Sequence, residues 1–232
     1  MTAGALAGKT AVVTGTAHGI GSAIAEALRG EGADTHGVDR DRADLTKPSE
    51  VRAFFDSVGG ADILVNTAGG VVGQVGRPIE EVSDEEWDAV VQANLYSAFL
   101  CTRAVVPSMK ERRWGRIVNI SSAAGLHHSL TGIQAYTSAK AAVIGLTRQL
   151  ASELGPFGVT VNCIAPGFIR SNPTTEQQWQ GYGPDGQRAL VAGIAMHRLG
   201  EPADIANGVR FFAAAQSSWV TGLVFAFDGG HA

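Results

Sequence analysis

Cysteine is scarce in this chain, and long apolar runs are missing. The two cysteines, Cys101 and Cys163, lie in apolar surroundings with no CxxC or Cys/His spacing. This pattern predicts buried free thiols in a reducing compartment, and neither thiol is expected to bind a metal. Residues 1–9 lack a basic region followed by an apolar stretch, and no apolar segment approaches the roughly 20 residues that a membrane span needs. We therefore expect a cytoplasmic protein with no membrane partner and no metal site.

Positive charge is also in short supply. The sequence has 18 lysines and arginines against 22 acidic residues, for a formal net charge of -4, and its basic residues are scattered. Such a surface has no basic stripe for a nucleic acid backbone, so we expect no nucleic acid partner. In contrast, 232 residues with 45% hydrophobic content are enough for a sizeable core. With no internal repeat, linker or low-complexity tract, the chain is predicted to form a single domain over 1–232.

Glycine is plentiful, and its placement near the N-terminus is informative. A short apolar strand at 9–13 runs directly into Thr14-Gly15-Thr16-Ala17-His18-Gly19-Ile20-Gly21, after which 22–29 has helical spacing. This order lets backbone N–H groups at a helix N-terminus face a pyrophosphate, with glycines where a side chain would block its approach. The candidate cofactor-binding residues in this turn are Gly15, His18, Gly19, Ile20 and Gly21.

The second predicted strand, 33–38, ends in Asp39. An acidic residue at this place accepts hydrogen bonds from an adenosine ribose diol and repels a 2′-phosphate, which favours NAD over NADP. Arg40 and Arg42 follow at once and would offset that repulsion, so NADP remains an alternative. The eight residues between Asp39 and Pro48 are too few for a crossover helix and a further parallel strand. We therefore expect a shortened sheet edge, with Asp44 and Leu45 beside the adenine.

The remaining chain alternates between apolar strands and amphipathic helices. Ser83 and Glu86 form a capping-box pattern at the start of a long helix that contains Asn94. The segment 172–196 is polar and irregular in composition. We predict a mobile lid here, with bounds at about 170–197. The other predicted elements are helices at 48–58, 134–154 and 202–215 and strands at 61–65, 116–120, 159–164 and 222–227.

Tyr136 and Lys140 are four residues apart near the start of the predicted helix 134–154. On a helix, residues at this spacing share a face, so both polar groups would project into the same cleft. A phenol titrates near pH ~10, and a neighbouring cation favours the phenolate and lowers its pKa. The pair could therefore move protons at neutral pH.

Together these motifs resemble the short-chain dehydrogenase/reductase family over nearly the whole chain. The turn Thr14-Gly15-xxx-Gly19-x-Gly21 is similar to the family's cofactor turn, Asn66-Thr67-Ala68-Gly69 to its Asn-Asn-Ala-Gly segment, and Tyr136-xxx-Lys140 to its active-site pair. The resemblance implies an α/β fold: a doubly wound Rossmann-type domain with a mostly parallel sheet and helices on both faces. It also implies a homotetramer formed through two long central helices.

Carried over by position, the resemblance implies a catalytic tetrad. Tyr136 would be the general acid/base, Ser122 would hydrogen-bond the substrate oxygen, Lys140 would lower the tyrosine pKa and bind ribose, and Asn94 would help to hold a water. Because the interval from Ser122 to Tyr136 is about one residue longer than usual, Ser121 or Ser129 are alternatives to Ser122. Further implied cofactor contacts are Asn66, Ala68, Gly69, Tyr136, Lys140, Pro166, Gly167, Ile169 and Ser171.

These inferences lead to a specific hypothesis. The chain is predicted to transfer a hydride between NAD and a small-molecule secondary alcohol or ketone. One alternative is an NADPH-dependent 3-oxoacyl reductase, and another is a non-enzymatic dinucleotide-binding sensor or scaffold. Trp179 and Tyr182 in the lid, with His127, His128 and Gln134, suggest a substrate pocket with aromatic walls and some polar contacts.

Overall fold

A parallel sheet of short apolar strands forms the centre of the molecule. The computed structural model describes residues 4–231. Its strands are β1 (Thr10–Thr14), β2 (Asp34–Val38), β3 (Ile63–Asn66), β4 (Gly115–Ile120), β5 (Val159–Pro166) and β6 (Val224–Phe227). Over the described range they form a six-stranded sheet in the order β2-β1-β3-β4-β5-β6, and every neighbouring pair is parallel.

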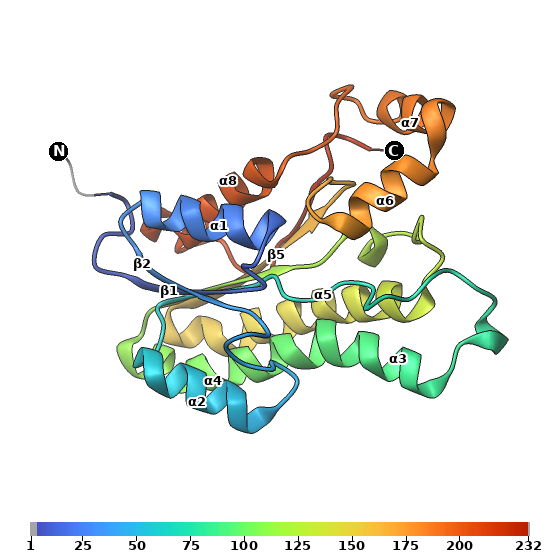
Figure 1. Ribbon diagram of the computed structural model, residues 1–232. Coiled ribbons are helices and arrows are strands. Elements are labelled where there is room, and N and C mark those ends of the chain that lie inside the picture. Colours follow the sequence, from blue (N-terminus) through green and yellow to red (C-terminus); the bar gives the residue numbers. More distant parts are fainter. Residues whose placement is uncertain (1–3, 232) are drawn as a thin grey trace.

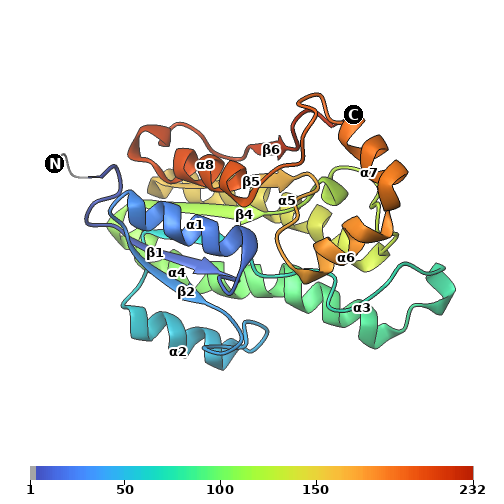
Figure 2. The same cartoon turned by 45° about the horizontal axis from the view of Figure 1, so that its top comes forward.

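Helices cover both faces of this sheet, as Figures 1 and 2 show. They are α1 (Gly19–Gly30), α2 (Pro48–Val58), α3 (Asp84–Val91), α4 (Ser97–Arg112), α5 (Gln134–Leu154), α6 (Pro173–Gly181), α7 (Gly183–Ala192) and α8 (Pro202–Ala213). Successive side chains of a strand point to opposite faces. Val13 therefore packs with α1 and α8, whereas Val12 packs with α2, α4 and α5. The predicted doubly wound α/β fold is confirmed.

The predicted shortened edge is also confirmed. After β2 the chain makes turns over 39–47 and then enters α2, so β2 itself is the outermost strand on that side. The carboxyl ends of all strands meet at one edge of the sheet, because parallel strands share a direction. The loops that follow the strands are thereby gathered at this edge.

The long helical run Asp84–Arg112 corrects one expectation. It is 29 residues long and contains a window of mean hydropathy 1.3, so by length and composition alone it passes the test for a membrane span. The prediction that no segment approaches this threshold is therefore wrong. Its apolar residues have another explanation, because Leu100, Val105 and Met109 are fully buried against the sheet. The burial of these side chains identifies the run as a core helix packed on the sheet.

The segment 172–196 is more regular than predicted. It forms two short helices, α6 and α7, where we expected irregular structure. Asn172 caps α6 in a capping box with Thr175, and Pro173 occupies the first helical turn, where its missing N–H costs nothing. Gly183, with φ of +61°, lies at the junction, which explains why one apparently broken segment folds as two helices. In Figures 1 and 2 both helices lie beyond the carboxyl edge of the sheet.

The packing of α8 against the sheet gives a test of the fold. A Cβ at Gly208 would lie 2.6 Å from the Phe227 ring and 2.9 Å from the Ile164 side chain. We expect Gly208→Ala to lower the free energy of unfolding by about 1–3 kcal/mol because it overpacks this contact. Urea denaturation would measure the change. Gly30→Ala, at a helical position with open space around it, is the matched control; equal stability of the two variants would contradict the packing described.

Candidate active site

A large cleft of about 1730 Å³ runs along the carboxyl edge of the sheet. The loops after β1, β2, β3, β4 and β5 all contribute to its walls. Two of the predicted site residues, Asn66 and Asn94, do not line it. The predicted residues that do line it are Gly15, His18, Gly19, Ile20, Gly21, Asp39, Asp44, Leu45, Ala68, Gly69, Ser122, Tyr136, Lys140, Pro166, Gly167, Ile169 and Ser171.

The glycine-rich turn is packed too closely for any other residue. Gly15 has φ of +72°, and a Cβ there would lie 2.9 Å from the Ala68 Cα. A Cβ at Gly19 would collide with the Ser171 carbonyl, and one at Gly21 with the Gly15 carbonyl. The turn leads into α1, whose N-terminal N–H groups receive no side-chain cap. The result is a cradle of free backbone donors at a helix N-terminus, which fits the pyrophosphate of a dinucleotide.

Asp39 lies across this turn. Its carboxylate accepts hydrogen bonds from the N–H groups of Ala17 at 3.0 Å and Arg40 at 2.8 Å. The two neighbouring arginines differ in where they lie. Arg40 lines the cleft, but the Arg42 guanidinium donates to the Gly37 carbonyl and lies over the Phe54 ring, outside the cleft. Of the two arginines that would offset the Asp39 charge, only Arg40 therefore lies in the cleft.

Asp44 and Leu45, which we expected beside an adenine, both line the cleft. The Asp44 carboxylate accepts hydrogen bonds from the Thr46 hydroxyl and N–H, and these contacts, with Lys47, hold its pKa below the usual range. Leu45 is buried and provides an apolar surface. This end of the cleft combines an acidic and an apolar group, which suits an adenosine.

Helix α5 carries Tyr136 and Lys140 in its first turns, and both line the cleft. The Lys140 ammonium lies 5.8 Å from the centre of the Tyr136 ring and donates a hydrogen bond to the Ile120 carbonyl at 3.0 Å. Lys140 is only 4% exposed. Burial lowers the pKa of Lys140 to about 8. A buried lysine held by a carbonyl at the edge of a cleft is typical of functional sites.

The pKa of Tyr136 shifts in the direction opposite to the prediction. Burial of the phenol raises its pKa, and a hydrogen bond with the Ser122 hydroxyl acts against this rise without reversing it. The predicted lowering by Lys140 is therefore wrong for the structure described here. The reason is geometric, because the Lys140 ammonium is directed to the Ile120 carbonyl.

Three serines were candidates for the position facing the substrate, and their hydrogen bonds separate them. Ser122 lies within hydrogen-bonding reach of Tyr136. Ser121 is buried and donates to the Lys140 carbonyl at 2.8 Å. Ser129 pairs with the Thr131 hydroxyl and accepts from the Thr131 N–H. The Ser122 hydroxyl also accepts a hydrogen bond from the Ala124 N–H at 3.2 Å, and of the three serines it is the one whose hydroxyl acts on the pKa of the tyrosine.

Asn94 lies behind the cleft in a π-turn, Gln92–Tyr96, that joins α3 to α4. Its amide donates to the Val90 and Gly70 carbonyls, both at 2.8 Å, and accepts from the Gly70 N–H at 2.9 Å. The side chain therefore anchors the loop after β3. π-turns are concentrated at functional sites, but the sequence pattern of an ordinary amphipathic helix gives no sign of one here.

Asn66 is also a buried supporting residue. Its amide donates to the Thr102 hydroxyl at 3.2 Å and to the Asn119 side chain at 2.8 Å. These bonds join β3 to β4 and α4. The adjacent Thr67 and Ala68 N–H groups both donate to the Thr14 hydroxyl at 2.9 Å. Together these contacts fix the end of β3 against the end of β1.

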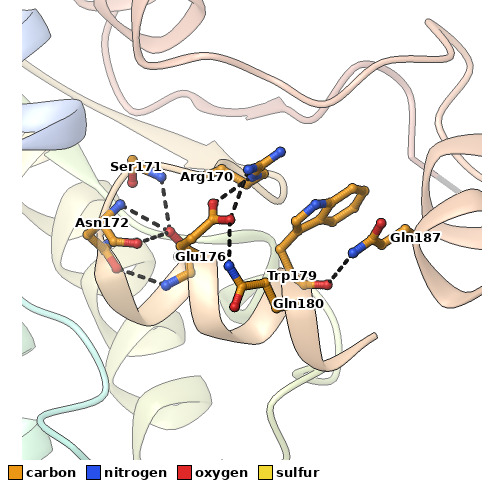
Figure 3. Close-up of polar contacts among 8 residues, drawn as sticks. Arg170, Ser171, Asn172, Glu176, Trp179, Gln180 and Gln187 are labelled. Atoms are coloured by element: carbon orange, nitrogen blue, oxygen red, sulfur yellow. Dashed lines mark hydrogen bonds and ion pairs between the residues drawn. The ribbon is translucent and has the colours of Figure 1, made fainter. Parts of the chain in front are cut away.

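The segment after β5 forms part of the lining of the cleft. Ser171 and Asn172 both donate their N–H groups to the Thr175 hydroxyl, which fixes the start of α6. Figure 3 shows Arg170 and Gln180 directed at the Glu176 carboxylate. Arg170 binds that carboxylate with two hydrogen bonds of 2.8 and 2.9 Å. These hydrogen bonds together hold the N-terminal turn of α6 in place.

The expected aromatic wall is only partly as predicted. Tyr182, His127 and His128 line the cleft, whereas Trp179 and Gln134 do not. Trp179 stacks on Phe168 with a ring separation of 6.2 Å and lies behind it. Sequence reasoning missed several further lining residues because they are far apart in the chain and carry no motif. They are Val72, Val75, Leu130, Phe168, Leu190 and His231.

Comparison with known proteins agrees with this geometry. The family model described as "Enoyl-(Acyl carrier protein) reductase" matches residues 42–232. The 3-oxoacyl-[acyl-carrier-protein] reductase FabG of Vibrio cholerae is 36% identical over 248 residues, covering 97% of this chain and 98% of that protein. The (2S)-[(R)-hydroxy(phenyl)methyl]succinyl-CoA dehydrogenase subunit BbsD of Thauera aromatica is 43% identical over 180 residues, covering 78% of this chain and 68% of that protein.

Solved structures show the same likeness. The ligand-free aldohexose dehydrogenase of Thermoplasma acidophilum superposes with a TM-score of 0.86 at 30% identity, covering 97% of this chain and 94% of that one. A 3-oxoacyl-[acyl-carrier protein] reductase of Brucella melitensis with bound NAD gives a TM-score of 0.83 at 31% identity, covering 98% and 93%. Both the sequence and the fold lead to one conclusion: the chain belongs to the short-chain dehydrogenase/reductase family, a family of oxidoreductases that bind a nicotinamide cofactor.

Proposed function

We propose that the protein is an NAD-dependent oxidoreductase that interconverts a secondary alcohol and the corresponding ketone, with Tyr136 as general acid/base. The observation that carries the proposal is the meeting of Tyr136, Ser122 and Lys140 in one cleft with a glycine cradle suited to a dinucleotide. The same combination argues against a non-enzymatic sensor. Such a protein would need the cradle but not the proton-transfer group.

The cofactor fits residues along the whole cleft. The glycine turn would hold the pyrophosphate, Asp39 the adenosine ribose, and the segment around Gly167 and Ser171 the nicotinamide end. Asn66 supports this site from behind, since its side-chain amide N–H groups already donate to Thr102 and Asn119. The bound nicotinamide supplies or accepts the hydride, and the protein provides position and proton transfer.

Proton transfer is the task of Tyr136 in this proposal. With its pKa raised by burial, the phenol is protonated at neutral pH and can donate its proton to a ketone oxygen. In the oxidation direction the phenol first releases its proton toward solvent, and the resulting phenolate accepts the proton of the alcohol. The contact with the Ser122 hydroxyl favours this phenolate. Ser122 also holds the substrate oxygen. Lys140 binds the nicotinamide ribose next to Tyr136.

Asn94 acts indirectly. Both of its amide hydrogens are donated to carbonyls, so a water held by this residue must donate to one of its oxygens. In that position the water would relay protons between the site and solvent. Its hydrogen bonds to Gly70 also hold the loop that forms one wall of the cleft.

An NADPH-dependent 3-oxoacyl reductase is the second candidate. It is favoured by the likeness to the FabG protein of Vibrio cholerae over nearly the whole chain. The Asp39 carboxylate opposes it, because the charge would face a 2′-phosphate with only Arg40 beside it. We therefore retain NAD as the preferred cofactor.

We also propose a cytoplasmic homotetramer. The compartment is supported by Cys101 and Cys163, which are both buried free thiols. The assembly is supported by exposed small residues on α5, among them Gly145, where a Cβ would meet open space. Small residues allow two helices to pack closely, and sedimentation equilibrium would measure the number of subunits.

Replacement of Tyr136 tests the chemistry directly. We expect Tyr136→Phe to lower kcat by more than about 100-fold, because the phenol proton is lost while the ring is kept. NAD binding should stay within about threefold of wild type, a free-energy change below 1 kcal/mol. Turnover and NADH fluorescence titration provide the two readouts. Activity that survives within about tenfold would refute the role of Tyr136.

Matched variants accompany this test. Lys140→Ala should damage both turnover and NAD binding, because Lys140 serves both. Ser122→Ala should lower kcat, whereas Ser129→Ala should not, because the Ser129 hydroxyl bonds within its own loop. The opposite order of the two serine variants would make Ser129 the substrate-facing serine.

Cofactor preference can be tested at Asp39. We expect wild-type kcat/KM to be at least about tenfold higher with NAD than with NADP, because like-charge contact with a 2′-phosphate costs free energy. Asp39→Asn keeps an oxygen acceptor for the Ala17 N–H but removes the charge, so the ratio should narrow. Arg40→Ala is the complementary variant and should reduce activity with NADP alone. A wild-type preference for NADP would overturn the assignment.

A further inference from the structure

Three exposed aliphatic side chains lie at the mouth of the cleft. Val72, Val75 and Leu130 are 40%, 67% and 57% exposed, and all three line the cleft. We refer to them as the aliphatic rim. Apolar side chains of this size are normally exposed singly, and a group of them at the entrance of a pocket indicates a binding surface.

The rim belongs to two loops that are joined. Val72 and Val75 lie in the loop before α3, and Leu130 lies in the loop before α5. Gly76 of the first loop packs so closely on the Thr131 carbonyl of the second that a Cβ would collide with it. The Gln134 amide also donates to the Arg77 carbonyl at 2.8 Å. The relative position of the two loops is therefore set by contacts within the protein.

Backbone strain marks the same place. Val72 has φ of +54°, in the left-handed region that β-branched residues rarely adopt. Such a conformation costs of order 1–3 kcal/mol and is concentrated at ligand clamps and active sites. The neighbouring turn is held by the Gln74 N–H, which donates to the Val71 carbonyl, and by the Gln74 amide, which donates to the Glu86 carbonyl.

The lid side of the cleft and the distribution of acidic residues also bear on what the rim could bind. Phe168, Tyr182 and Leu190 line the cleft on the lid side. Within the described part of the chain, the acidic residues that line the cleft are Asp39 and Asp44, both at the adenine end. Several polar groups near the rim bond to one another and need no ligand, including Ser129 with Thr131 and Gln178 with Tyr182. The rim, with Phe168 and Leu190, thus contributes apolar surface to the cleft, next to polar lining residues such as His127, His128 and Gln177.

We propose that the substrate is a secondary alcohol or ketone with a hydrocarbon arm, and that the aliphatic rim holds this arm. The inference rests on the proposed function and narrows its substrate class. It predicts that affinity rises with arm length, because each methylene that leaves water contributes about 0.8 kcal/mol. A free sugar, whose hydroxyls would lose hydrogen bonds to water against this surface, is disfavoured.

Binding can be measured without turnover. Methyl ketones of increasing length, from pentan-2-one to nonan-2-one, are titrated into the Tyr136→Phe variant with NADH bound, and the NADH fluorescence is followed. We expect the Kd to fall about 3- to 4-fold for each added methylene. Dihydroxyacetone, which cannot close into a ring, serves as the polar ketone for comparison. A flat series, no measurable binding of the methyl ketones, or tighter binding of dihydroxyacetone would overturn the inference.

A matched set of rim variants assigns the effect to these residues. Val75→Thr combined with Leu130→Asn keeps the side-chain shapes but adds polar atoms, and we expect it to reduce the change in Kd per methylene to below about twofold. Leu223→Asn makes the same exchange at an exposed position outside the cleft and should leave the series unchanged. Lost self-association with an unchanged series would make the rim a subunit contact and overturn the inference.

Turnover by the wild-type protein separates this inference from the proposed function. If the wild-type protein oxidises polyols and the Kd does not depend on the length of a hydrocarbon arm, the proposed dehydrogenase function stands and the role of the rim is refuted. Binding that depends on arm length, with no turnover of any alcohol in a broad panel, would keep the rim and refute the proposed reaction.

Discussion

The site depends on a reciprocal clamp between helix α5 and the end of β4. The Lys140 ammonium donates to the Ile120 carbonyl, and the Ser121 hydroxyl donates to the Lys140 carbonyl. Gly125 lets the two segments approach, since a Cβ there would lie 2.8 Å from the Lys140 carbonyl carbon. These hydrogen bonds are buried, where breaking one leaves an unsatisfied polar group. The clamp therefore fixes the position of α5, which carries Tyr136, relative to the end of β4, which Ser122 follows.

A second set of buried polar contacts keeps the cofactor end of the cleft in register. The Thr14 hydroxyl accepts hydrogen bonds from two successive N–H groups after β3, and Asn66 links that strand to Asn119 in β4. Asn119 in turn donates to Thr147 in α5. The network thus runs from the first strand to the helix that carries Tyr136. Because the hydrogen bonds of this network are buried, they hold the walls of the cleft rigidly in place.

Charge and burial divide the cleft into two regions. Asp39 and Asp44 are acidic residues that line the cleft, whereas Lys140 has no carboxylate partner among residues 4–231. Burial lowers the pKa of this lysine to about 8 and raises that of the neighbouring tyrosine. Both shifts favour the neutral form of the group, as desolvation always does. Elsewhere in the cleft the aliphatic rim contributes apolar surface, and the lid contributes mainly uncharged polar side chains.

The sequence by itself determined the sheet, its shortened edge, and the positions of the glycine turn, Asp39 and the Tyr136/Lys140 pair. Such features depend on local signals: apolar periodicity, glycine placement, the eight residues between Asp39 and Pro48, and spacing along a helix. Tertiary structure alone decided the rest. The π-turn at Asn94, the direction of the Lys140 ammonium, the two lid helices and the aliphatic rim arise from contacts between segments distant in the chain. A linear pattern carries no record of such contacts, because packing and hydrogen bonding across the sheet edge select among conformations that local propensity leaves open.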